Sequence, residues 1–76
     1  MKLYLKITKL MKEKNLIQAR LLEKIDLDQP RLSAIMTGKE AKNISLRTAL
    51  QICKGLDVDI YELIEGTEYD EENADV

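Results

Sequence analysis

The side chains with the clearest capacity for recognition chemistry lie between residues 29 and 37. Gln29 and Arg31 each offer paired hydrogen-bonding groups, and the same polar face carries Ala34 and Thr37. Catalytic chemistry is harder to find. The chain has no His and a single Cys, which excludes a Ser-His-Asp set, a Cys-His pair and a conventional zinc site. We therefore expect a binding protein without a cofactor, and no enzyme.

Two short helices must position this face. The spacing of apolar residues predicts a helix over residues 18–25, a turn at 26–27 and a second helix over 29–37. Asp28 is a favourable N-cap, and Pro30 fits the first turn, where a missing N–H costs nothing. Gly38 is expected to end the second helix. Helices this short are unstable alone, so the rest of the chain must hold them.

Three further helices are predicted around this pair, over residues 3–14, 46–54 and 59–65. Asn15, Gly55 and Gly66 are expected to end them. The helix over 46–54 has a broad apolar stripe, which predicts that it is the most buried one. The stripe consists of Leu46, Ala49, Leu50, Ile52 and Cys53. The expected fold class is all-α, a compact domain of five helices over residues 1–66.

The charges are divided unevenly along the chain. Residues 1–54 carry a net +7 and residues 55–76 a net −9, which together give the overall −2. Because electrostatic footprints are local, the basic part favours a nucleic-acid partner. Residues 67–76 are acidic and without periodicity, so we expect a mobile tail. The lone Cys and the lack of a long apolar run favour a cytoplasmic protein.

The ordered set of motifs resembles the Cro/phage-repressor class of helix-turn-helix DNA-binding domains. The resemblance covers roughly residues 3–65 and is strongest in the stretch NISLRTALQICKGLDVDIYEL. The residues that carry it before that stretch are Gln18, Leu21, Leu27, Leu32, Ile35, Gly38 and Lys39. It implies a lambda-repressor-like fold in which the helix over 29–37 enters the major groove.

The resemblance also implies roles for particular residues. Base contacts are expected from the resemblance at Gln29, Pro30 and Ala34. Arg31 is added for its chemistry, because Arg can bond guanine through two hydrogen bonds, as Gln can bond adenine. Contacts with the DNA backbone are expected at Gln18, Thr37, Lys39, Lys42 and Asn43. Ile60 and Tyr61 are expected to join two subunits.

Several residues depart from the family pattern. The turn usually carries Gly where this chain has Asp26, and Asp is expected to tolerate the left-handed conformation there. Asp28 replaces the usual Ser or Thr cap, and Leu22 replaces a small residue between the two helices. Met11 and Met36 stand where many members place an ion pair, so we expect an apolar contact there.

The leading hypothesis is a sequence-specific DNA-binding regulator, a repressor that acts as a homodimer on double-stranded DNA. The alternative is an antitoxin or another protein-binding helix-turn-helix module, whose acidic tail would dock a protein partner. The alternative is motivated by the few hydrogen-bonding side chains on the recognition helix and by the acidic terminal third.

Overall fold

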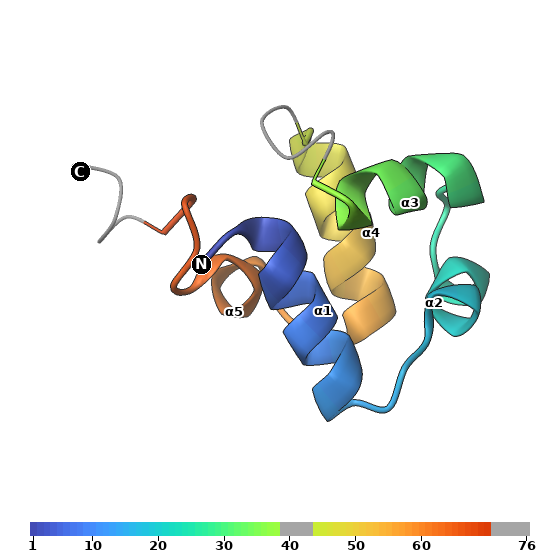
Figure 1. Ribbon diagram of the computed structural model, residues 1–76, viewed down its shortest axis with the longest axis horizontal. Helices are drawn as coiled ribbons and strands as arrows, with labels where there is room; N and C mark the ends of the chain where they lie inside the picture. The colour runs from blue at the N-terminus through green and yellow to red at the C-terminus, as the bar shows by residue number, and fades with distance from the viewer. Residues whose placement is uncertain (39–43, 71–76) are drawn as a thin grey trace.

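The computed structural model describes residues 1–38 and 44–70, and the regular structure of these ranges is entirely α-helical. Its elements are α1 (Leu3–Glu13), α2 (Gln18–Lys24), α3 (Gln29–Met36), α4 (Leu46–Leu56) and α5 (Ile60–Ile64) (Figure 1). Each predicted helix is present, so the all-α five-helix fold is confirmed.

α3, α4 and α5 begin at residues whose side chains satisfy a free backbone N–H. Asp28, Ser45 and Asp59 each accept a hydrogen bond from the backbone N–H three residues later, at 3.0, 3.1 and 2.8 Å. Such a cap is worth about 1 kcal/mol. Asn15 and Gly38 adopt positive φ angles of 54° and 82° after α1 and α3, as predicted. Local sequence signals therefore account for most of the helix boundaries.

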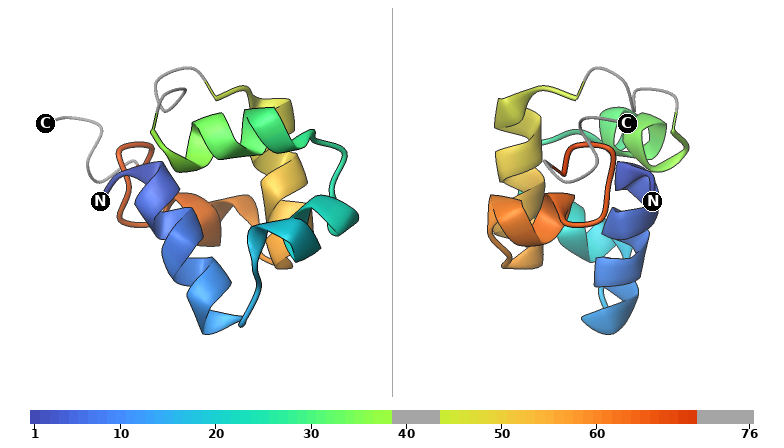
Figure 2. Two further views of the ribbon diagram at one scale, coloured as in Figure 1. Left: turned by 45° about the vertical axis from the view of Figure 1, so that its right-hand side comes forward. Right: turned by 90° about the vertical axis from the view of Figure 1, so that its left-hand side faces the viewer.

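A single hydrophobic core takes side chains from every helix. α1 packs against α3 and α5, whereas α4 packs against α2 and α5 (Figures 1 and 2). The buried apolar residues are Leu3, Ile7, Leu10, Met11, Leu21, Leu32, Ile35, Ala49, Ile52, Cys53, Leu56 and Leu63. Leu22 and Met36 pack half-buried against this core. The apolar residues that replace the usual small residue and ion pair are thus part of the packing.

The predicted apolar stripe of α4 was partly wrong. Leu46 and Leu50 are 68% and 50% exposed, although both were expected to face inward. The buried arc is centred on Ile52 and Leu56 and extends instead to Thr48. At 100° per residue, Leu50 lies about 160° around the helix axis from Ile52, so it must face solvent.

The predicted end of α4 at Gly55 was also wrong. The helix continues to Leu56, and Asp57 takes the left-handed conformation with a φ angle of 58°. Gly55 is buried inside the helix, where a Cβ would lie 2.6 Å from Cγ2 of Ile25 and closer still to Cδ1 of Leu21. The absence of a side chain at Gly55 therefore allows α2 to pack close to α4.

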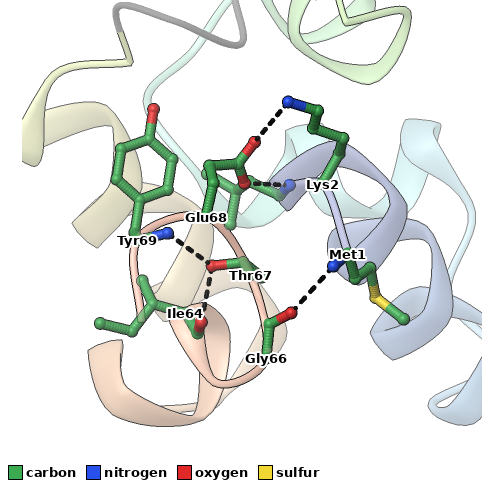
Figure 3. Close-up of polar contacts among 8 residues, drawn as sticks. Met1, Lys2, Ile64, Gly66, Thr67, Glu68 and Tyr69 are labelled. Carbon is green, nitrogen blue, oxygen red and sulfur yellow. Dashed lines mark hydrogen bonds and ion pairs between the residues drawn. The ribbon is translucent and has the colours of Figure 1, made fainter. Parts of the chain in front are cut away.

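The segment after α5 packs against the beginning of α1 (Figure 3). Thr67 is 1% exposed, and Oε1 of Glu68 accepts a 2.6 Å hydrogen bond from the backbone N–H of Leu3. The amino group of Met1 donates to the Gly66 carbonyl at 3.0 Å. Residues 67–70, predicted to begin the acidic tail, lie beside the beginning of α1. The remainder of that tail, residues 71–76, lies outside the described residues.

Candidate nucleic-acid interface

α3 presents a polar face to solvent while its apolar face joins the core. Leu32 and Ile35 are buried, and α3 packs mainly against α1. Gln29, Pro30 and Arg31 are exposed together in the first turn of the helix. The structure thus brings three of the four expected base-contacting residues to one exposed end of α3.

The fourth expected residue, Ala34, is half-buried and sits one turn after Pro30. Within residues 1–38 and 44–70, neither the Gln29 amide nor the Arg31 guanidinium has a hydrogen-bond partner among the side chains or backbone. The carboxylate of Asp28 is engaged as the cap of α3 through the N–H of Arg31. The recognition chemistry of the first turn is therefore available to a ligand.

The turn before α3 differs from the prediction. Asp26 was expected in the left-handed conformation, but within the described residues only Asn15 and Asp57 among the non-glycine residues have positive φ. α2 ends at Lys24, and Ile25 is extended with φ −127° and ψ 159°. Asp28 is also extended, and the chain turns between Ile25 and Asp28 without a left-handed residue at position 26.

The residues expected to contact the DNA backbone are only partly placed. Gln18 is exposed at the first position of α2. Thr37 is exposed after α3, but its hydroxyl already donates to the Ala34 carbonyl at 3.0 Å. Since phosphate oxygens only accept, Thr37 must rotate before it can donate to one. Lys39, Lys42 and Asn43 lie outside the described residues.

Sequence reasoning missed one exposed residue of this face. Ser33 is exposed and lies one turn after Gln29 and one turn before Thr37, on the same line along α3. Its hydroxyl can both donate and accept, so it can contact either a base edge or a phosphate. The i, i+4 spacing from Gln29 was the signal that could have identified it.

The expected dimer residues occupy α5. Tyr61 is 75% exposed, whereas Ile60 is half-buried against the core. Tyr61 is therefore the accessible member of the pair, and Ile60 is shared with the interior of the domain.

Other kinds of chemistry find little support in the described ranges. Cys53 is 5% exposed, and burial, with a further contribution from the Asp59 carboxylate, raises the pKa of its thiol. A raised pKa keeps the thiol protonated and unreactive. No group of three His, Cys, Asp or Glu residues within residues 1–38 and 44–70 could hold a metal ion. None of the helices in these ranges has the length and apolar character needed to cross a membrane.

Two short helices joined by a tight turn, with the second presenting polar side chains outward, define a helix-turn-helix domain. A family model described as the Cro/C1-type helix-turn-helix DNA-binding domain matches residues 6–68. The chain belongs to this family, and it is a DNA-binding regulator in this general sense. Comparison with curated proteins and with solved structures gave no significant match.

Proposed function

We propose that the protein is a sequence-specific transcriptional repressor that places α3 in the major groove of its DNA site. The observation that carries the proposal is the exposed first turn of α3, which presents both the Gln29 amide and the Arg31 guanidinium to solvent. Arg31 would bond guanine and Gln29 adenine, while Pro30 and Ala34 would contact thymine methyl groups. Bound at a promoter, the protein would repress by blocking polymerase.

The remaining expected contacts would position the domain on the duplex. Phosphates would be contacted by Gln18, Thr37, Lys39, Lys42 and Asn43. Two copies would pair through Ile60 and Tyr61, so that their recognition helices enter successive major grooves about 34–36 Å apart. The preferred site would then be a near-palindrome with half-sites about 10 bp apart. The protein would act in the cytoplasm, where such DNA is accessible.

Selection of bound duplexes from a random pool tests the proposed readers. Arg31→Ala should relax the preference at one base pair of each half-site, because one good bidentate contact is worth about 1–3 kcal/mol of discrimination. Gln29→Ala should relax the preference at a different base pair. The selected sequences, read by sequencing after several rounds, report both effects.

Lys9→Ala is the matched control, since Lys9 is exposed on α1 and its loss also removes one positive charge. This variant should bind slightly less tightly but select the same sequence. If the two α3 variants select the wild-type sequence as well, α3 is not the element that reads DNA.

The alternative, a module whose main partner is a protein, is favoured by the exposed apolar residues Leu46 and Leu50, which lie one turn apart on α4. Contiguous exposed apolar patches mark protein interaction surfaces. Coexpression with the product of the adjacent gene, followed by affinity purification, tests this function. A stable complex that excludes DNA would favour an antitoxin, and the absence of a complex would count against it.

A further inference from the structure

The turn between α2 and α3 is held from outside by α4. Because α2 ends at Lys24, the backbone N–H of Asp26 lies beyond the helix. This N–H donates to Oε1 of Gln51 at a distance of 3.1 Å. The side chain of Gln51 is half-buried, so part of it is already fixed by its surroundings.

Gln51 and Gly55 form one continuous contact face on α4. They lie four residues apart and therefore on the same side of the helix. Gly55 leaves room for Leu21, the buried residue of α2, and for Ile25, the residue that caps the end of α2. One face of α4 thus holds both the end of α2 and the first residue that follows it.

The position of this anchor matters because the two helices of the motif pack on different partners. α2 packs mainly against α4, whereas α3 packs mainly against α1. The turn over residues 25–28 is the covalent joint between them, and the Asp28 cap fixes the beginning of α3 only two residues after Asp26. The geometry at Asp26 therefore controls how Gln29 and Arg31 are presented.

We propose that Gln51 is a positioning residue for DNA recognition, which sets the angle of α3 by binding the turn at Asp26. This inference rests on the proposed function, since it assigns Gln51 to the reading of DNA by α3. Gln51 itself contacts no base. It acts through the backbone of the turn, and a side chain of equal length without a good acceptor cannot replace it.

Amide hydrogen exchange measured by NMR tests the anchor without DNA. In Gln51→Met, which keeps the length and helical propensity of the side chain, the Asp26 N–H should exchange about threefold to tenfold faster, as expected for the loss of one hydrogen bond. In Gln51→Glu the carboxylate oxygen can accept the same bond, so exchange should stay slow. Exchange at the wild-type rate in Gln51→Met would overturn the inference.

DNA binding tests the consequence. Gln51→Met should bind the selected duplex about threefold to tenfold more weakly, because the loss of one hydrogen bond shifts an equilibrium by about that factor. Its affinity for unrelated duplex should stay close to wild type, while its thermal midpoint should fall by about 4–8 °C, as the loss of one hydrogen bond gives in a domain of this size. A variant that merely weakens the fold would lower both affinities together.

Gln51→Glu needs a control for charge, and Lys54→Gln provides one. Both changes lower the net charge of α4 by one within a single turn, so the two variants should bind the selected duplex equally if the anchor is restored. A positioning role would be contradicted if Lys54→Gln bound the selected duplex more tightly than Gln51→Glu does. Binding by Gln51→Met with wild-type affinity would also contradict it. A wild-type protein that selects no duplex would overturn the proposed function, while the exchange data would still decide whether Gln51 holds the turn.

Discussion

Gly55 lies inside α4, and its missing side chain has a packing role. A Cβ at this position would collide with Leu21, which is completely buried, and with the branched side chain of Ile25. The left-handed cap that glycine often supplies is provided by Asp57 instead. The residue that looked like a helix terminator is thus the point of closest approach between two helices.

Gly55→Ala should destabilise the domain although Ala favours helices. The gain in helical propensity is about 1 kcal/mol, whereas forcing an extra methyl group into a packed interior costs about 1–3 kcal/mol. We therefore expect a net loss of about 1 kcal/mol in the free energy of unfolding, measured by urea denaturation. Lys54→Ala, on the exposed side of α4, should change stability by less than about 0.5 kcal/mol. A Gly55→Ala protein more stable than wild type would show that the packing is not tight.

The helices of this domain differ in how they are capped. α3, α4 and α5 carry their caps immediately before them, but α1 has no cap from Lys2 and no acidic residue in its first turn. Glu68, 65 residues later in the sequence, accepts the hydrogen bond from the Leu3 N–H. Its negative charge at the beginning of α1 also complements the helix dipole. The 3.9 Å ion pair with Lys2 is largely exposed and adds little. α1 therefore depends on a distant segment for its beginning.

Glu68→Ala should lower the free energy of unfolding by about 1 kcal/mol, the usual value of an N-cap. Glu65→Ala is the matched control, because Glu65 contributes its carbonyl to Lys6 and its side chain is not needed for that bond. The control should unfold at nearly the wild-type urea concentration. Equal losses in the two variants would indicate a general effect of charge and contradict a capping role.

The features that could be predicted from the sequence are those encoded within a few residues. The apolar spacing identified all five helices, and the cap at Asp28 was recognised from its local pattern. The bonds from Gln51 to Asp26 and from Glu68 to Leu3 join residues 25 and 65 positions apart, so no local pattern could reveal them. The exposure of Leu46 and Leu50 likewise depends on which helices surround α4.

The candidate site shows the same division between local and distant information. The exposure of Gln29 and Arg31 followed from the helical period, and that of Ser33 could have been found in the same way. The prediction for Asp26 was wrong, since its φ is not positive, and its N–H donates to a side chain from α4 that no local pattern reveals. The helical period identifies an exposed face, but it does not give the angle at which that face is held.

The whole molecule separates its charges along the chain. The net +7 of residues 1–54 flanks the helix-turn-helix motif in the sequence: residues 1–17 carry +4 and residues 39–54 carry +3, whereas residues 18–38 have three basic and three acidic side chains. α5 and the segment that follows it lie in the part that carries −9. Figure 2 shows α5 below α3 rather than beside its first turn. Attraction to a polyanion must therefore come from the basic residues that flank the motif, because the field near the contact face decides the interaction.

DNA affinity should consequently depend strongly on salt. If each subunit of a dimer neutralises three or four phosphates, the slope of log K against log salt concentration should lie near about −5 to −7. Fluorescence anisotropy titrations at several potassium chloride concentrations measure this slope. An affinity that is unchanged across the series would contradict the proposed mode of binding.

The cap of α1 has a consequence for how the protein is made. The hydrogen bond from the Leu3 N–H can form only after Glu68 is synthesised, 65 residues later. α1 also needs α5 as a packing partner. Contacts between residues so far apart in the sequence form late in folding, because the entropy cost of closing the long loop between them must be met first. During translation α1 therefore remains incomplete until residues 60–68 have left the ribosome. Since α3 packs against α1, the helix that we propose to read DNA is completed in a folding step that follows synthesis of the domain.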